Sequence, residues 1–172
     1  MSQDTPKRYS PLWVTLHWAI ALLLLTEFSL GLSIRFLPAD QWPNIMRWHV
    51  PVGISILLLM IVRLIVRQRT PRPAPATAGS PLLDMIGVAT HHTLYLLAIL
   101  MPLAGISLAL VYGLLPIQVG AAADLLWRFG SLHKWIAIAL ALLIGLHIGA
   151  AFYHQLFSKD NLLSRMWYPK SS

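Results

Sequence analysis

The stretch that decides the fold covers residues 131–157 and reads SLHKWIAIALALLIGLHIGAAFYHQLF. Its only charged residue is Lys134, but it contains three histidines, His133, His147 and His154. A spacing of 14 residues is close to four helical turns, so His133 and His147 share a face about 21 Å apart along the axis. His154 returns to that face about 10 Å further on. Histidines within a membrane segment usually face a partner, so we expect other helices to supply one.

The composition is that of an integral membrane protein. Of the 172 residues, 57% are hydrophobic and 11% are charged, whereas soluble domains carry about 25% charged residues. The length fits a single domain, residues 1–172. The chain has no cysteine, which excludes disulfides, iron–sulfur clusters held by thiolates and the C-x-x-C-H attachment of c-type haem. A haem would therefore be held by histidine or methionine.

Long apolar runs predict four membrane-spanning helices, at about residues 12–34, 48–67, 83–112 and 131–157. The first run is too long for a signal-peptide core and lacks a small-residue cleavage site, so we interpret it as a retained helix. Pro51 falls in the first turn of the second predicted helix, where proline is tolerated.

The predicted connections are a loop at 35–47 with Pro38 and Pro43 as breakers, a proline-rich linker at 68–81 and a loop at 113–130. Short connections between long helices favour an all-α, up-down-up-down four-helix bundle.

The 13 basic residues are distributed unevenly between the two sides of this bundle. Nine lie on the side of the termini: Lys7, Arg8, Arg63, Arg67, Arg69, Arg72, Lys159, Arg165 and Lys170. The other four are Arg35, Arg47, Arg128 and Lys134. Because cytoplasmic segments are enriched in Lys and Arg, we expect both termini in the cytoplasm.

The histidines fall at two depths in the predicted bundle. The outer level holds His49 and His133. The inner level holds His17 and His147, with His91, His92 and His154 as further candidates. Two histidines that face each other across a bundle supply the axial ligands of a six-coordinate haem b, so two levels predict two haems.

Small residues beside these histidines are consistent with space for a porphyrin. Gly53 lies one turn after His49, and Gly145 and Gly149 flank His147. The alternative is that the glycines serve close helix packing. Zinc is the competing metal, but it usually takes four protein ligands, or three and a water. The outer level offers two histidines and, at most, Glu27, whose role the sequence leaves unassigned.

Four stretches carry a resemblance to a known family. They are RYSPLWVTLHW at 8–18, RWHVPVGISILLLMIVRLIVR at 47–67, HHTLYLLAILMPLAG at 91–105, and HKWIAIALALLIGLH at 133–147 with H-x4-KDN at 154–161. In these the chain resembles the prokaryotic cytochrome b561 family of small di-haem membrane proteins. The match looks close to the superoxide oxidase branch, which passes electrons from superoxide to ubiquinone. Residues 113–130, which would cover the outer haem, do not match clearly.

The resemblance implies roles for individual residues. His17 and His147 correspond to the inner haem ligands, and His49 and His133 to the outer ones. His91 matches a third-helix histidine that lies near the inner haem without binding it. His154 and Lys159 match the inner, quinone-side surface. Together with His91, they are the candidates to pass protons to a quinone there.

The basic residues near each level have two interpretations. Arg47, Arg128 and Lys134 would steer anionic superoxide to the outer haem, or anchor the helices at the interface. Arg63 and Arg67 would neutralise propionates of the inner haem, or reach to lipid headgroups.

The sequence leaves three candidate functions open. The first is a superoxide:ubiquinone oxidoreductase, and the second is a quinone-linked cytochrome b that serves a separate dehydrogenase or a periplasmic redox partner. The third is a non-redox bundle with structural histidines. Membrane lipid surrounds the protein in each, and no nucleic-acid partner is expected.

Overall fold

The computed structural model describes residues 8–75, 77, 79–115, 123–159 and 161–168. The helices are α1 (Pro11–Ser33), η1 (Ala39–Gln41), α2 (Trp42–Arg69), α3 (Pro81–Val111), α4 (Ala123–Tyr153), η2 (His154–Ser158) and α5 (Leu162–Arg165). No strand occurs in these described ranges, which confirms the all-α prediction.

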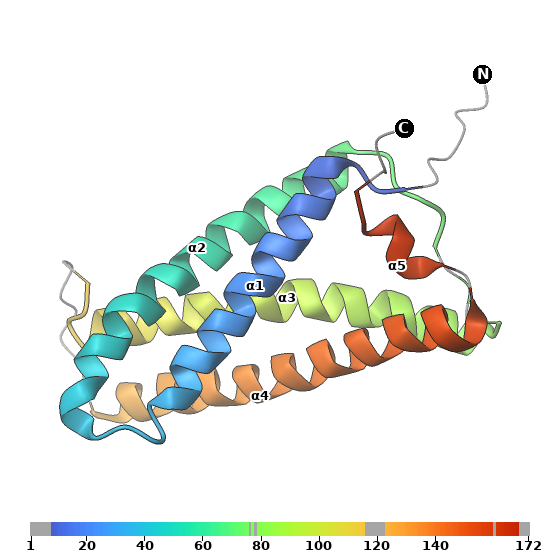
Figure 1. Cartoon of the computed structure of the whole chain (residues 1–172). Helices are drawn as coiled ribbons and strands as arrows, with labels where there is room; N and C mark the ends of the chain where they lie inside the picture. Colours follow the sequence, from blue (N-terminus) through green and yellow to red (C-terminus); the bar gives the residue numbers. More distant parts are fainter. Residues whose placement is uncertain (1–7, 76, 78, 116–122, 160, 169–172) are drawn as a thin grey trace.

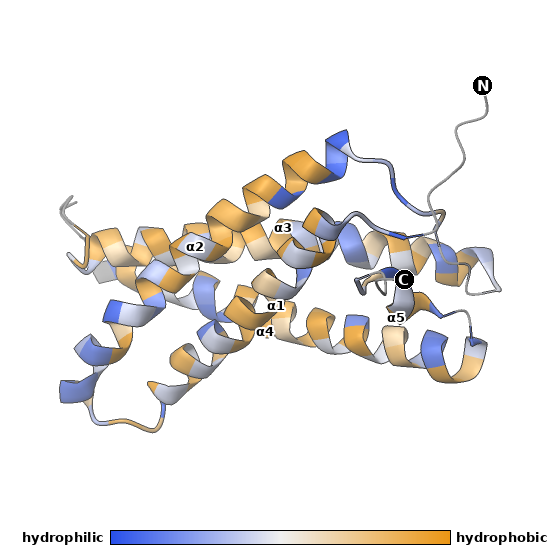
Figure 2. Cartoon of the chain, turned by 45° about the horizontal axis from the view of Figure 1, so that its top comes forward, coloured by the Kyte–Doolittle hydropathy of each residue, from blue (hydrophilic) through white to orange (hydrophobic). Residues whose placement is uncertain are grey.

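Four of the helical segments are long and apolar enough to cross a membrane. Helix α2 packs against α1 and α3, and α3 packs against α4 (Figure 1). Most of each long helix consists of hydrophobic residues, and hydrophilic residues gather toward the helix ends and the connections (Figure 2). The chain is therefore a four-helix membrane bundle.

Prolines mark the starts of three of these helices. The Ser10 side chain accepts a hydrogen bond from the Trp13 amide, and Pro11 opens α1. Pro81 opens α3, although the Ser80 side chain before it makes no capping hydrogen bond. At this position the missing N–H of proline costs nothing, because the first amides of a helix have no partner within it. Pro43 likewise sits in the first turn of α2, not in a loop.

The start of α2 differs from the one predicted from the sequence. It begins at Trp42, six residues before the predicted position, so Pro51 lies inside α2 and not in its first turn. The prediction of a first-turn Pro51 was therefore wrong, because Pro43 can begin a helix as well as break one. Helix α4 also begins early, at Ala123, within the stretch that we expected to be a loop.

The buried core lies midway along the bundle. It consists of one cluster with members from all four long helices: Ile20, Ile56, Met60, Ala98 and Leu140. Leu140 is midway in sequence between His133 and His147. The core therefore separates the two levels of histidines.

The two ends of the described chain meet at one end of the bundle, which we call the terminal end (Figure 1). The Tyr9 amide donates to the Arg165 carbonyl oxygen at 3.3 Å. The Trp18 indole donates to the Met166 carbonyl oxygen at 2.9 Å, and Arg165 donates to the Ala74 carbonyl oxygen at 3.0 Å. The C-terminal segment thus ties α1 to the linker after α2. Lys7 and Lys170, which contributed to the orientation argument, lie outside the described residues.

Candidate functional site: two pairs of histidines

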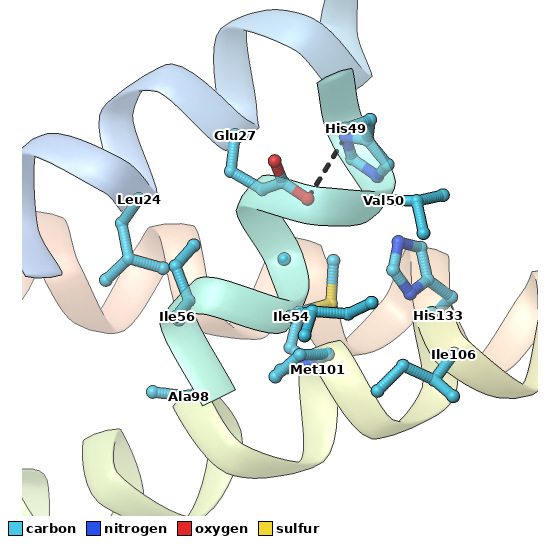
Figure 3. Close-up of a pocket in the computed structure, with 13 residues that line it drawn as sticks. Leu24, Glu27, His49, Val50, Ile54, Ile56, Ala98, Met101, Ile106 and His133 are labelled. Atoms are coloured by element: carbon cyan, nitrogen blue, oxygen red, sulfur yellow. Dashed lines mark ion pairs between the residues drawn. The ribbon is translucent and has the colours of Figure 1, made fainter. Parts of the chain in front are cut away.

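The first pair of histidines lies at the end of the bundle opposite the termini. His49 projects from α2 and His133 from α4, and their ring centres are 6.1 Å apart with the planes at 74°. Both residues are half-buried. They line a cavity whose other walls are mainly apolar (Figure 3). The structure therefore brings together the two residues assigned to the outer level.

The second pair lies near the terminal end. The ring centres of His17, from α1, and His147, from α4, are 6.2 Å apart with the planes at 68°. Both residues are half-buried, whereas His91 and His92 on α3 are exposed. The His91 ring lies closer to His147, at 5.2 Å between centres.

These separations test whether a haem fits. A bond of about 2.0 Å from a metal to each imidazole nitrogen, plus about 1.1 Å from nitrogen to ring centre, places the centres of two opposed ligands roughly 6.2 Å apart. The pairs His49–His133 and His17–His147 match this distance closely. The contact between His91 and His147 is about 1 Å too short for two ligands on opposite sides of one iron. The geometry therefore favours His17 over His91 as the partner of His147.

The number of available protein ligands also distinguishes a zinc site from a haem iron. No three His, Cys, Asp or Glu side chains converge as ligands of one metal ion in the part of the chain that the structure describes. A zinc site would need three or four protein ligands. Paired imidazoles instead suit an iron whose remaining four positions are filled by a porphyrin.

Glycines give the first pair of rings their space. A Cβ atom added to Gly31 of α1 would lie 3.3 Å from Cε1 of His49, and one added to Gly105 of α3 would lie 3.1 Å from Cε1 of His133. Each imidazole thus packs against a helix that has no side chain at the contact. We had not predicted these two roles, because the sequence does not say which helix faces which ring.

Glycines of the second level behave differently. A Cβ atom at Gly145 or Gly149 would meet no atom within 4 Å. These two glycines therefore make no close helix contact in the described structure, which removes the packing alternative for them here. They leave the surface of α4 beside His147 open.

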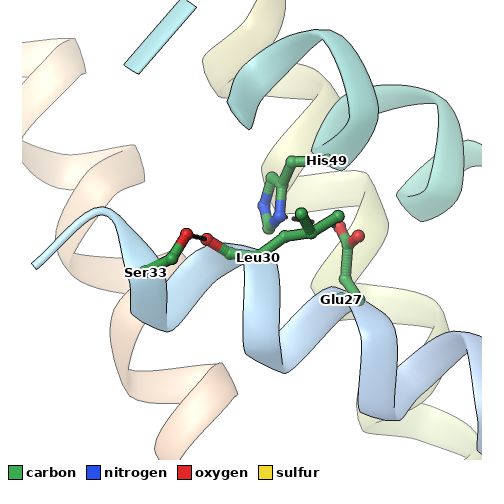
Figure 4. A network of polar contacts seen from close by, with 4 residues as sticks. All are labelled: Glu27, Leu30, Ser33 and His49. Atoms are coloured by element: carbon green, nitrogen blue, oxygen red, sulfur yellow. Dashed lines mark hydrogen bonds and ion pairs between the residues drawn. The ribbon is translucent and has the colours of Figure 1, made fainter. Parts of the chain in front are cut away.

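Glu27 is the residue whose role the sequence left unassigned. Its Oε1 atom lies 3.2 Å from Nδ1 of His49, and both side chains are largely buried (Figure 4). The two residues belong to α1 and α2, and Figure 3 shows the carboxylate pointing toward the imidazole. Nothing in the sequence indicates this contact, because it depends on how the two helices are rotated.

Comparisons with known proteins identify the family of this chain. A family model described as prokaryotic cytochrome b561 matches residues 8–169. The chain belongs to the prokaryotic cytochrome b561 family. It is therefore a membrane electron-transfer protein of a family that binds haem b. The resemblance inferred from the sequence is confirmed.

Individual relatives carry different names within this family. A Yersinia pestis protein named "Probable superoxide oxidase CybB" is 32% identical over 93% of this chain and 96% of that protein. An Escherichia coli (strain K12) protein named "Cytochrome b561 homolog 2" is 30% identical over 98% and 96%. A Cereibacter sphaeroides protein named "Cytochrome b562" is 32% identical over 94% and 96%.

The arginines assigned to propionates lie at the terminal end of this cytochrome. The Arg63 Nε–H donates to the Tyr95 hydroxyl at 2.9 Å, and a nitrogen of Arg67 lies 3.3 Å from Nε2 of His92. Both guanidinium groups also contact the face of the Tyr95 ring. Tyr95 lies one turn after His91, whose ring contacts His147. Tyr95 thus holds a pair of cations beside the second histidine pair.

The residues assigned to superoxide steering lie at the opposite end. Arg47 and Lys134 lie two residues before His49 and one residue after His133, and each rests over a tryptophan ring, Trp48 and Trp135. Arg128 is different, because its Nε lies 4.0 Å from a carboxylate oxygen of Asp124. The neighbouring carboxylate partly offsets its charge.

The quinone-side candidates His154 and Lys159 lie at the end of α4, where the α-helix continues as a π-helical turn. His154 begins the π-helical turn η2, and Lys159 follows it with a φ of 51°. Such turns widen a helix and are frequent at functional sites. The His154 ring contacts the Tyr153 ring edge-on, with their centres 6.2 Å apart.

Proposed function

We propose that this cytochrome is a di-haem b oxidoreductase that moves electrons across the bilayer. His49 and His133 would hold the iron of one haem, and His17 and His147 that of the other. The observation that carries the proposal is the pair of ring separations, 6.1 and 6.2 Å, at two levels of one bundle. We further propose that residues 1–172 form one domain in the bacterial inner membrane, with both termini in the cytoplasm.

Haem b, when bound at these pairs, supplies reversible transfer of one electron. The chain sets the distance between the two centres, because His133 and His147 on α4 are separated by about 21 Å along the axis. The apolar cluster around Leu140 and Ile56 fills the space between them and excludes water. Two centres at two depths give electrons a route across the apolar part of the membrane.

The donor that we propose is superoxide at the outer pair. Two superoxide anions each give up one electron and leave as O2, so this half-reaction needs no proton. Arg47 and Lys134 flank the outer histidines in sequence and would raise the encounter rate of an anion. The name of the Yersinia pestis relative supports this choice of donor.

The acceptor that we propose is ubiquinone at the terminal end. Ubiquinone takes up two electrons and two protons to become ubiquinol, so this half-reaction needs groups that exchange protons with water. His154 and Lys159 are suitable because they lie at the end of α4, near the terminal end. Histidine is the side chain that most often transfers protons in enzymes.

The test is superoxide-dependent ubiquinone reduction by the purified protein, followed after its reduced-minus-oxidised spectrum has shown b-type haem. We expect reduction faster than the uncatalysed rate and suppressed by superoxide dismutase. Reduction at the uncatalysed rate, in protein that carries both haems, would exclude superoxide as the donor.

That negative result would favour a second candidate, a quinone-linked electron-transfer cytochrome that serves a separate redox partner. The relatives named "Cytochrome b561 homolog 2" and "Cytochrome b562" support this alternative, because their names specify no substrate. Reduction of the haems by ubiquinol, without superoxide, would then be expected.

A further inference from the structure

Glu27 is the only glutamate in the sequence, and it lies inside the bundle. Its Oε1 atom is 3.2 Å from Nδ1 of His49, and the side chains are 13% and 15% exposed. Helix α2 accommodates the carboxylate, because a Cβ atom on Gly53 would lie 3.0 Å from the same Oε1 atom. Glycines on both helices, Gly31 on α1 and Gly53 on α2, thus leave space for the contact between Glu27 and His49.

The contact is close, but it is not a formed hydrogen bond. Nδ1 of His49 and Oε2 of Glu27 make no hydrogen bond with any described residue. Buried polar groups without partners are costly, so a small rotation of the imidazole that completes the bond would be favourable. A histidine that binds metal through one ring nitrogen almost always donates the other N–H to a carboxylate or carbonyl group.

The two histidine pairs differ in the charge beside them. The outer pair has the Glu27 carboxylate against His49. At the inner level the charged group is Arg63, which lies 14 residues after His49 on α2, about 21 Å further along the axis, and donates to the Tyr95 hydroxyl. A negative charge favours the oxidised, more positive iron, and a positive charge favours the reduced iron.

We propose that Glu27 is a positioning residue for His49 that also sets the order of the two haem potentials. Its carboxylate accepts the Nδ1 proton of His49 and so directs Nε2 toward the iron. Its charge, opposed to that of Arg63 at the other level, makes the outer haem the harder one to reduce. With haem bound at both pairs, this order of potentials would favour transfer of one electron from the outer level to the inner level. This inference rests on the proposed di-haem function and adds a cause for its direction.

The test is a redox titration of the purified holoprotein and its Glu27→Gln variant, followed by haem absorbance with chemical mediators. Glutamine keeps an acceptor oxygen and removes the charge, so both haems should remain bound. We expect the potential of the outer haem to rise by a shift equivalent to about tenfold in the one-electron equilibrium, about 59 mV, with the inner haem unchanged.

The matched control is Asp40→Asn, which removes an exposed acidic charge from η1 on the same side of the bundle. It should leave both potentials unchanged. Unchanged potentials in Glu27→Gln, or equal shifts of both haems, would overturn the inference.

A second variant tests orientation separately. Glu27→Leu removes the acceptor, so we expect weaker binding of the outer haem, with a loss of about tenfold or more in affinity. Full retention of the outer haem at the same affinity would contradict a positioning role. These titrations need no superoxide or quinone, so the inference can fail while the proposed reaction stands. Protein that carries no haem would instead contradict the proposed function.

Discussion

The imidazole rings of His49 and His133 face each other with their centres 6.1 Å apart, although one belongs to α2 and the other to α4. No direct bond joins them. Their spacing instead equals what two nitrogen ligands on opposite sides of one metal require. The same relationship recurs at the other level between His17 and His147, at 6.2 Å.

Replacing either outer histidine should remove one haem of two. His49→Ala and His133→Ala each delete an axial ligand, and a low-spin haem with two histidine ligands needs both. The measurement is haem content per chain by pyridine haemochrome. His92→Ala is the control, because His92 is exposed and bonded to the Val88 carbonyl oxygen. Two haems retained in either outer variant would contradict the assignment.

Two variants at the inner level test whether His17 or His91 is the partner of His147. His17→Ala should lose the inner haem, whereas His91→Ala should keep it, because the distance from His91 to His147 is too short for opposed ligands. Haem content and the low-temperature spectrum of each variant report the outcome. Loss of haem in His91→Ala with retention in His17→Ala would reverse the choice of ligand.

A single added side chain should disturb only the outer level. In Gly105→Val the Cβ atom would lie 3.1 Å from Cε1 of His133, so the ring must move and outer haem occupancy should fall by half or more. Gly87→Val, on the same helix, is the matched control, since its Cβ atom would meet nothing within 4 Å. Equal occupancy in the two variants would show that the contact is unimportant.

The sequence predicted the bundle and its histidine levels well, for a physical reason. Apolar runs long enough to cross a membrane have few alternatives to helix, and helical periodicity fixes which residues share a face. The depth of His49 and His133 therefore followed from counting residues.

Contacts between helices were less predictable. The pairing of Glu27 with His49 and the spaces at Gly31 and Gly105 depend on helix rotation, which residue spacing within one helix does not determine. Helix starts were also uncertain, because a proline such as Pro43 can either end a segment or open a helix.

Charge at the outer end should control the rate with superoxide. Arg47→Gln and Lys134→Gln should each lower superoxide-driven reduction by up to about tenfold at low salt, and the difference should vanish at high salt. Arg128→Gln should have less effect, because Asp124 lies beside Arg128. Stopped-flow haem reduction across ionic strengths measures this. A rate independent of salt in the unaltered protein would rule out steering.

The C-terminal segment should contribute to stability. Trp18→Phe removes the indole N–H that donates to the Met166 carbonyl oxygen at 2.9 Å, which should cost about 1 kcal/mol in the free energy of unfolding. Proteolysis after Lys159 should become faster in the same variant. Trp135→Phe, at an exposed position on α4, is the control for loss of an indole. Equal free energies of unfolding in the two variants would show that the hydrogen bond from Trp18 to Met166 does not contribute to stability.

The central claim is that one chain holds two haems between two pairs of histidines. The most direct measurement is the amount of haem b per chain in the purified protein, from pyridine haemochrome and quantitative amino-acid analysis. We predict two haems per chain, both low-spin with histidine on each side. One haem or none per chain, in fully folded protein, would contradict the account.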